Sequence, residues 1–240
     1  MKVASYNIHK CRGTDGLVRP ERIIDVILEI NADLVALQEV DPRFGRRGSV
    51  LDADLVSRET GMRLLAQSDV PDRHGWHGNA LLVRGDPKTY HRSQLRLPGF
   101  EPRGAIIAEL DLGDGAFRVI AAHFGLLRRS RIDQANALLA AFNKAPRMRT
   151  ILLGDLNEWR RYRRSALDIL EPTFGRGPRI PSYPSRRPLF PLDCILGWPS
   201  GLVTTIAIHD SPLARRASDH LPLTATVVLH GHQKELHWAA

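Results

Sequence analysis

The sequence has little of several features that would narrow its class. Only two cysteines occur among 240 residues, Cys11 and Cys194, too few for a secreted disulfide framework. The longest uncharged stretch, residues 194–209, is interrupted by glycine and proline and is too short to span a bilayer. The N-terminus has neither an apolar core nor a small-residue cleavage site, so no signal peptide is visible. These absences favour a cytoplasmic protein with no transmembrane segment.

Lysine is also rare. Of the 34 basic residues, 29 are arginine, whose planar guanidinium group suits phosphate. Against 26 acidic residues the net charge is +8, which can attract nucleic acid, anionic lipid or phosphorylated metabolites. An arginine-rich composition also arises from codon bias, so the charge permits a phosphate-bearing partner without identifying it.

Several catalytic motifs are missing as well. There is no G-x-S-x-G elbow, and adjacent side chains on an extended chain, as in Ser218-Asp219-His220, point opposite ways; both facts disfavour a serine hydrolase. Without C-x-x-C or H-E-x-x-H spacing, a zinc site is disfavoured too. No Walker P-loop is present.

What is present is the composition of an ordinary folded domain. Hydrophobic residues make up 43% and charged residues 25%, close to globular averages. No repeat or linker divides the chain, so we expect one domain over residues 1–240, with a core at about 1–230.

The pattern of apolar residues predicts an α/β protein with mixed sheets. A strand over residues 2–8, a helix starting at Pro20 and a buried strand over 34–38 form a crossover unit. Residues 104–112 and 116–122 flank Gly113-Asp-Gly115, which indicates a hairpin. We also expect a helix around residues 132–142 and strands at 78–84, 149–154, 192–196 and 221–229.

Residues 158–187 combine eight arginines with four aromatic residues. Such a mixture suits phosphates with stacked bases, or a lipid interface, and makes Arg160 and Arg161 candidate substrate-binding residues. The alternative, equally weighted, is a solvated loop and helix whose aromatic side chains pack inward.

Polar residues recur where expected strands begin or end. In α/β sheets such strand ends meet at one crevice where ligands bind, and grouped oxygen ligands suit a hard cation such as Mg²⁺. Each residue also has a structural interpretation, as a turn residue, a solvated loop or a core histidine. The residues are Asn7, Glu39, His123, Asp155, Asn157, Asp193, Asp219 and His220.

The order of these motifs resembles the endonuclease/exonuclease/phosphatase superfamily, in particular its deoxyribonuclease I-like and sphingomyelinase-like metal-dependent phosphodiesterases. The resemblance implies an α/β (α+β) four-layer sandwich, in which two packed, mixed and mostly antiparallel β-sheets are flanked by helices. It also implies a Mg²⁺ cofactor, for which Mn²⁺ can substitute. The matching segments are SYN (5–7), LQEV (37–40), GNALL (78–82), AHFG (122–125), GDLN (154–157), LDCIL (192–196) and SDHLPL (218–223).

The resemblance also implies a role for each residue at the metal and the attacking water. Glu39 would be the principal metal ligand, with Asn7 and Asp219 beside it. Asp155 would orient and activate the attacking water, and Asn157 would hydrogen-bond the phosphate or that water.

The remaining roles concern the phosphate and the leaving group. His220 would contact the phosphate with its charge supported by Asp193, and His123 would donate to a phosphate oxygen or to the leaving group. Asn79 would line the substrate cleft, and the helix at Arg131 to Gln134 would give structural support.

The substrate is less narrowly implied than the reaction. The abasic-DNA branch of the superfamily has threonine and lysine after the glutamate and tyrosine at the position of His123, whereas this chain has Val40-Asp41 and a histidine. An endonuclease-like phosphodiesterase acting on DNA or RNA is favoured by the charge. A phospholipid or sphingolipid phosphodiesterase would need an exposed apolar loop, to which Phe190, Leu192 or Trp198 could contribute. The remaining alternatives are a phosphatase on a small phosphate ester and, least favoured, a non-catalytic scaffold.

Overall fold

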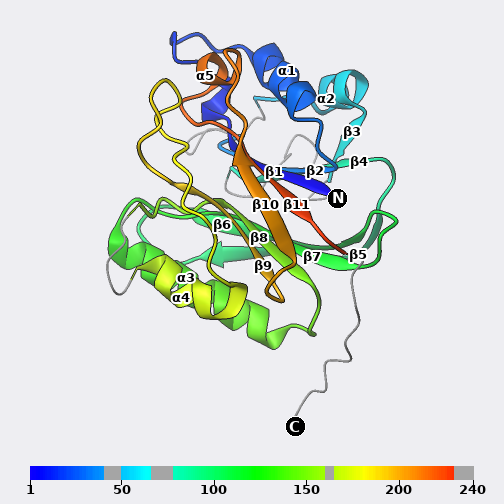
Figure 1. Ribbon diagram of the computed structural model, residues 1–240, viewed down its shortest axis with the longest axis vertical. Helices are drawn as coiled ribbons and strands as arrows, with labels where there is room; N and C mark the ends of the chain where they lie inside the picture. Colours follow the sequence, from blue (N-terminus) through cyan, green and yellow to red (C-terminus); the bar gives the residue numbers. More distant parts are fainter. Residues whose placement is uncertain (41–49, 66–77, 160–164, 230–240) are drawn as a thin grey trace.

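Two β-sheets form the centre of the protein (Figure 1). The computed structural model describes residues 1–40, 50–65, 78–159 and 165–229. Within these residues the first sheet has six strands: β1 (Lys2–Asn7), β2 (Leu34–Gln38), β3 (Met62–Leu64), β4 (Ala80–Arg84), β10 (Val203–Ile208) and β11 (Leu223–Val227). Their order across the sheet is β10-β11-β1-β2-β4-β3, and β1 runs parallel to β2.

The second sheet has five strands in the described part of the chain: β5 (Lys88–Leu97), β6 (Arg103–Asp111), β7 (Phe117–His123), β8 (Thr150–Asp155) and β9 (Asp193–Trp198). They lie side by side in sequence order, and only the β7–β8 pair is parallel. The expected hairpin is confirmed. The antiparallel pairing of β6 and β7 extends as far as Leu110 and Phe117, and the turn at Gly113–Gly115 connects the two strands.

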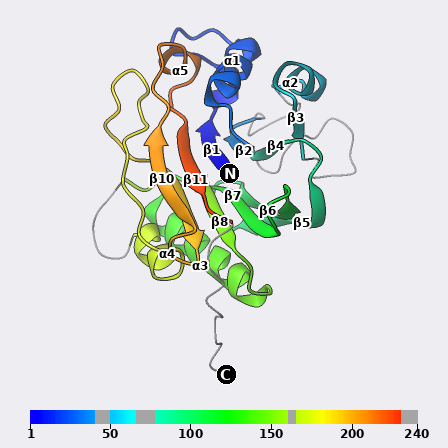
Figure 2. The same ribbon diagram turned by 45° about the vertical axis from the view of Figure 1, so that its right-hand side comes forward.

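Helices cover the outer face of each sheet, as Figures 1 and 2 show. On the first sheet lie α1 (Pro20–Ile30), α2 (Ala53–Thr60) and α5 (Ala214–Ala217), and on the second lie α3 (Arg128–Lys144) and α4 (Ala166–Phe174). A short 3₁₀ turn at His9–Cys11 follows β1. α1 begins with Pro20 in its first turn and ends where Asn31 adopts a left-handed conformation. The four-layer sandwich expected from the resemblance is therefore confirmed.

Apolar side chains fill the space between the two sheets. Val3, Leu34 and Leu81 from the first sheet meet Val119 and Ile151 from the second, and all five are fully buried. Two further apolar clusters lie beneath the helices, one under each outer layer. Because the sheets pack face to face, the carboxyl ends of their central strands come together at one edge.

The sequence missed the strands β3, β5 and β10 and the short helices α2 and α5, whereas α4 matches the helix that was one alternative for residues 158–187. β10 holds only half-buried and exposed residues, so its apolar content gives little periodicity. Of the expected aromatic cluster in residues 158–187, Phe174 is buried in the core beneath α4, whereas Trp159 and Tyr183 line a cavity. No helix within the described residues has the length and apolar content needed to cross a membrane.

Candidate active site

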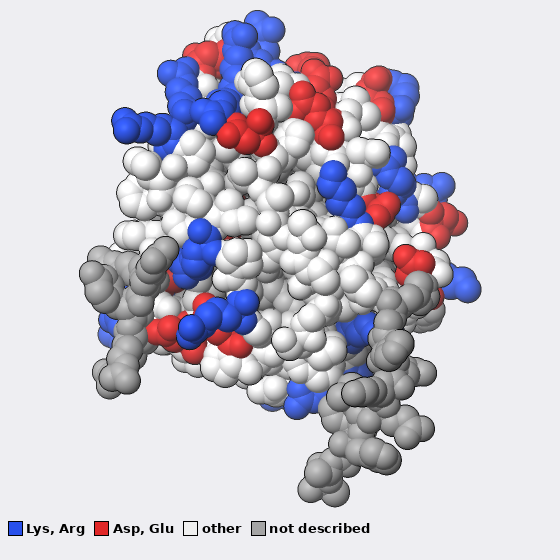
Figure 3. Space-filling model, viewed as in Figure 1, with Lys and Arg blue, Asp and Glu red and all other residues white. Residues whose placement is uncertain are grey.

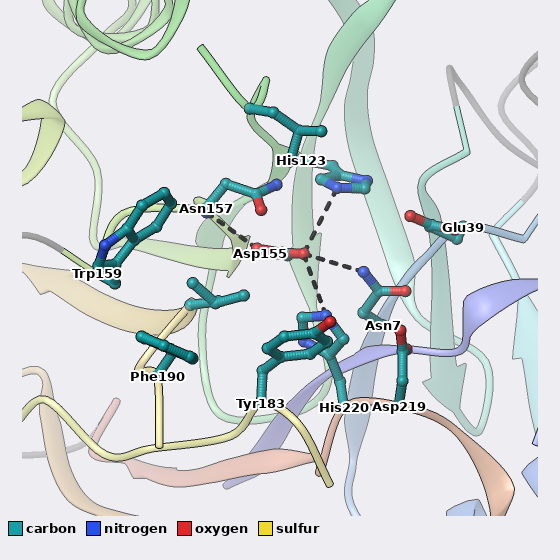
Figure 4. A pocket seen from close by; sticks show the side chains of 12 residues that line it. Asn7, Glu39, His123, Asp155, Asn157, Trp159, Tyr183, Phe190, Asp219 and His220 are labelled. Atoms are coloured by element: carbon teal, nitrogen blue, oxygen red, sulfur yellow. Dashed lines mark hydrogen bonds and ion pairs between the residues drawn. The ribbon is translucent and has the colours of Figure 1, made fainter. Parts of the chain in front are cut away.

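A cavity of about 350 Å³ opens at the edge where strands of both sheets end (Figure 4). Asn7 is the last residue of β1 and Glu39 follows β2, while His123 and Asp155 are the last residues of β7 and β8. His123 and Asp155 are also neighbours across the parallel β7–β8 pair. The full lining is Asn7, Glu39, His123, Leu126, Asp155, Asn157, Trp159, Tyr183, Phe190, Leu192, Asp219 and His220.

Asp155 lies at the centre of this cavity, with only 1% of its surface exposed. Its Oδ2 accepts a hydrogen bond from Asn7 Nδ2 at 2.9 Å and lies 3.5 Å from His123 Nε2 and 3.8 Å from His220 Nε2. Its Oδ1 accepts from the backbone N–H of Asn157 at 2.9 Å. One carboxylate thus joins groups from both sheets, as the dashed lines in Figure 4 show.

His220 is held from behind by a second carboxylate. Its Nδ1 lies 2.8 Å from Asp193 Oδ2, and the Ser182 hydroxyl donates to the same oxygen at 2.5 Å. The Tyr183 ring lies 4.9 Å from the imidazole, centroid to centroid. The ring of His220 is therefore fixed, with Nε2 directed toward Asp155.

Burial and neighbouring charges shift the pKa values of Asp155 and His220. Burial raises the pKa of Asp155 to about 6; the His220 charge opposes this shift and Asp193 adds to it. For His220, burial lowers the pKa, but the carboxylates of Asp193 and Asp155 outweigh it and raise the value to about 10. At neutral pH, His220 is therefore an imidazolium able to donate a hydrogen bond to an anion, beside a mainly ionised Asp155.

His123 is buried against an arginine that the sequence did not single out. Arg103 Nη1 lies within 2.9 Å of the imidazole, and Nη2 donates to Glu101 Oε2 at 2.8 Å. Both Arg103 and His123 are 2% exposed. Only the pairing of β6 with β7 brings these two residues together, so no local sequence signal could reveal the contact.

Side-chain oxygen atoms of Glu39, Asn7 and Asp219 lie along one side of the cavity. Glu39, in a left-handed conformation at φ 59°, forms an ion pair with Lys10, and Asp219 Oδ1 lies 3.6 Å from His9 Nδ1. Asn7 Oδ1 accepts from the backbone N–H of His9 at 3.1 Å. Within the described residues, no three His, Cys, Asp or Glu side chains are arranged as a ready-made metal cage. Mg²⁺ needs only one or two carboxylates plus waters, so the donor set fits that ion chemically.

The close approach of β7 and β8 depends on Gly154. Its φ of 150° suits glycine, and a Cβ atom there would lie 1.8 Å from the carbonyl oxygen of Ala122. Asn157, at φ 52°, donates from Nδ2 to the carbonyl of Phe124 at 3.0 Å. These contacts fix the turn that carries Asp155 and Asn157 against the end of β7.

The next residues of this turn are held by a buried ion pair. Glu158 accepts from Arg131 Nε at 3.3 Å, both residues are 1% exposed, and the Arg131 guanidinium lies 5.3 Å from the Trp159 ring. Arg131 also donates to the carbonyl of Leu126. Arg131 therefore supports both loops that border the cavity on this side.

The structure brings together most of the residues expected at the site, but not all. Asn79 is fully buried, donates to the carbonyl of Gly104 at 2.9 Å and does not line the cavity. This bond links β6 to the residue preceding β4, so it connects the two sheets. Arg160 and Arg161 lie outside the described residues. Residues that the sequence did not assign to the site are Leu126, Trp159, Tyr183, Phe190 and Leu192 in the lining, and Ser182 behind it.

Comparison with known proteins gives the family. Residues 4–220 match the model of the endonuclease/exonuclease/phosphatase family. The chain belongs to this family. Its members are phosphoric ester hydrolases, so the chain is an enzyme of that class.

Two similar proteins match nearly the whole chain. YbhP of Escherichia coli strain K12, described as uncharacterized, is 28% identical, with 95% of this chain and 96% of YbhP covered. A functionally unknown protein from Enterococcus faecalis V583 has a similar structure, with a TM-score of 0.71, 21% identity, and coverage of 95% of this chain and 99% of that one.

Two other solved structures carry functional names. D. rerio TDP2 complexed with a single-strand DNA product has a TM-score of 0.67 and 16% identity over 94% of this chain and 97% of its own. The mannosyl-6-phosphatase Bt3783 of Bacteroides thetaiotaomicron has a TM-score of 0.66 and 15% identity over 95% and 99%. At these identities, the likeness shows the shared fold alone.

Proposed function

We propose that this protein is a Mg²⁺-dependent phosphodiesterase in which Asp155 directs a water molecule at phosphorus. The observation that carries the proposal is the convergence of Asn7, His123 and His220 on one buried oxygen of Asp155. These three groups come from both sheets. A carboxylate that only stabilised the fold would not need to lie at the wall of a cavity with three polar groups around it.

The metal would be held by Glu39 with Asn7 and Asp219 beside it. All three line the cavity and offer oxygen atoms, the ligand type that Mg²⁺ prefers. When bound, the ion would stabilise negative charge on the phosphate and on the leaving oxygen. Lys10, which now pairs with Glu39, would have to give up that contact. Mn²⁺ would serve the same donors.

Asp155 would orient the water and accept its proton. With a pKa of about 6, the carboxylate is mainly ionised at neutral pH and still basic enough to take a proton as the attack proceeds. The water oxygen forms a new bond to phosphorus while the ester P–O bond breaks. The products are a phosphomonoester and an alcohol.

The histidines would serve the phosphate and the leaving group. His220, charged and backed by Asp193, would donate to a non-bridging phosphate oxygen. His123 would donate to another phosphate oxygen or protonate the departing alkoxide, and Asn157 would hydrogen-bond the phosphate or the water. Each part of the hydrolysis thus has a residue in this cavity, which argues against the scaffold alternative.

On sequence alone, the net charge of +8 and the arginine and aromatic residues of 158–187 favour a nucleic-acid substrate. A phospholipid and a small phosphate ester are the alternatives. The complex of TDP2 with a DNA product and the phosphatase activity named for Bt3783 both support phosphoester hydrolysis.

The reaction is tested with two substrates, bis(4-nitrophenyl) phosphate and supercoiled plasmid. We expect Mg²⁺-dependent release of nitrophenol, its loss in EDTA and its loss in His220→Ala. His91→Ala, a substitution of an exposed histidine on β5, is the matched control and should retain full activity. Nicking of the plasmid would support nucleic acid as substrate. Hydrolysis that persists in EDTA or in His220→Ala would contradict the proposal.

A further inference from the structure

One side of the catalytic cavity is apolar and open to solvent. Leu126, Trp159 and Phe190 line the cavity and are 54%, 40% and 42% exposed. The rings of Trp159 and Phe190 lie 6.4 Å apart, and Arg131 joins Trp159 to the Leu126 backbone. Figure 4 shows Trp159 and Phe190 on the side opposite Glu39 and Asn7. These residues therefore form one continuous apolar wall.

The two loops that supply this wall share a composition. Leu126-Leu127-Arg128-Arg129 precedes and opens α3, and Arg186-Arg187-Pro188-Leu189-Phe190 precedes β9. In each loop two apolar residues and two arginines are exposed, and the outer leucines, Leu127 and Leu189, are 53% and 58% exposed. Each segment thus places apolar tips and cationic groups side by side at the cavity mouth.

A third loop carries another exposed apolar residue. Phe100 is 90% exposed, and its loop is fixed to the same region because Glu101 accepts from the backbone N–H of Leu126 at 3.1 Å. Gln134 of α3 also donates to the carbonyl of Pro98 at 2.9 Å. We call the set Phe100, Leu126–Arg129 and Arg186–Phe190 the apolar rim.

Single exposed leucines are normal on protein surfaces, but a group of them around a catalytic opening indicates an interaction site. Exposed leucine side chains neither pair with phosphates nor stack on bases, so they contribute little to nucleic-acid binding. At a bilayer, apolar tips enter the boundary between headgroups and acyl chains, and neighbouring arginines attract anionic lipid.

An arginine-rich part of the described surface near α1 and α5 contains several ion pairs. Near α1 and α5, Arg22 and Arg216 pair with Asp15, and Arg215 pairs with Asp210. On the face shown in Figure 3, basic and acidic side chains lie together at that end, and a broad uncharged area occupies the middle. The positive charge of this region is thus partly neutralised by its own carboxylates.

We propose that the apolar rim docks the protein onto an anionic phospholipid bilayer, so that the phosphodiester of a lipid headgroup enters the catalytic cavity. This inference rests on the proposed function and names its substrate class. Leu127 and Leu189 enter the bilayer surface, and the arginines beside them contact lipid phosphates. The apolar wall at Trp159 and Phe190 covers the first carbons of the lipid held at Asp155.

Binding is tested by co-sedimentation with vesicles in EDTA, so that turnover plays no part. We expect binding to equimolar phosphatidylglycerol and phosphatidylcholine, and much weaker binding to phosphatidylcholine alone. Leu127→Ser/Leu189→Ser should weaken binding about tenfold or more, because burying one leucine side chain contributes about that factor. The matched control, Leu28→Ser/Val228→Ser, removes two exposed apolar residues outside the rim and should bind like the wild type.

Measuring hydrolysis of two substrates distinguishes a failure of the docking surface from a failure of the proposed function. The rim variant should hydrolyse bis(4-nitrophenyl) phosphate at the wild-type rate but lose hydrolysis of vesicle phosphatidylglycerol by about tenfold or more. The proposed docking surface would be overturned if the wild-type protein did not bind anionic vesicles, or if the rim variant bound them like the control. Plasmid nicking unaffected by the rim substitutions, without lipid hydrolysis, would overturn it in favour of nucleic acid. Failure to hydrolyse the small diester would instead refute the proposed function.

Discussion

The two sides of the catalytic cavity are built in different ways. The polar side comes from strand ends, and its central residues Asp155, His123 and His220 are nearly fully buried and contact one another. The apolar side comes from loops, and Leu126 and Phe190 are about half exposed. In the proposed mechanism, rigid strands hold the reacting groups in place, whereas loops define what surrounds the substrate. Chemistry and substrate recognition would then be carried by different parts of the fold.

The largest effect is expected for Asp155→Asn on the polar side. We expect kcat/KM for bis(4-nitrophenyl) phosphate to fall about 10³-fold or more, because the amide cannot accept the proton of the attacking water. The free energy of unfolding should stay the same or rise, since burial already disfavours this carboxylate. Steady-state kinetics with urea unfolding measures both. Near-normal kcat would show that the chemistry does not centre on Asp155.

Removal of the metal, or of its principal ligand, should have the next largest effect. EDTA should abolish hydrolysis, and excess Mg²⁺ should restore it. In Glu39→Gln, half-maximal activity should require roughly tenfold more Mg²⁺ or a still higher concentration, because an amide oxygen carries no charge for the cation. Titration of activity against Mg²⁺ tests this. Equal Mg²⁺ requirements in the variant and the wild type would place the metal elsewhere.

Asp193→Asn should lower activity about 10- to 100-fold, since Asp193 acts through His220 rather than on the substrate. It should also change the pH dependence of stability. The pKa of His220 is raised from 6.5 to about 10, so its stabilising contribution is fully present below about pH 6.5 and is lost as pH rises through about 10. In the variant this loss should shrink and move to lower pH. Urea unfolding across that range is the measurement, and an unchanged profile would contradict the pairing.

The smallest effect is expected on the apolar side. Trp159→Ala should raise KM for an apolar diester about tenfold while kcat changes little, because in the proposed mechanism the ring would contact the leaving alcohol and not the reacting atoms. Dimethyl phosphate, which has no large apolar group, serves as the control substrate and should show no such increase. A fall in kcat for both substrates would mean that the two sides of the cavity are not independent.

The sequence could predict the polar side because each residue directly follows or precedes an apolar strand. Asp155 at the end of the buried strand β8 and Glu39 after β2 are local patterns, and parallel pairing brings such ends together. Arg103 could not be found in this way. Its contact with His123 depends on the register of β6 and β7, which sequence periodicity does not give.

The apolar side of the cavity shows a second limit of prediction from the sequence. A lipid-binding loop was expected to draw on Phe190, Leu192 or Trp198, yet their positions differ. Phe190 is exposed at the cavity, Leu192 lines it with 9% exposure, and Trp198 packs against the core residue Phe142. Exposure of an apolar residue is a property of the assembled fold, so composition alone could not distinguish these three.

The position of β11 makes activity a late event in the life of the chain. This strand enters the first sheet between β10 and β1, and His220 lies just before it. During synthesis at roughly 5–20 residues per second, about 10–40 s separate Asn7 from His220. Until β11 is in place, Asp155 and Asp193 have no imidazole between them. In the proposed mechanism, a nascent chain therefore cannot hydrolyse its substrate before β11 has joined the sheet.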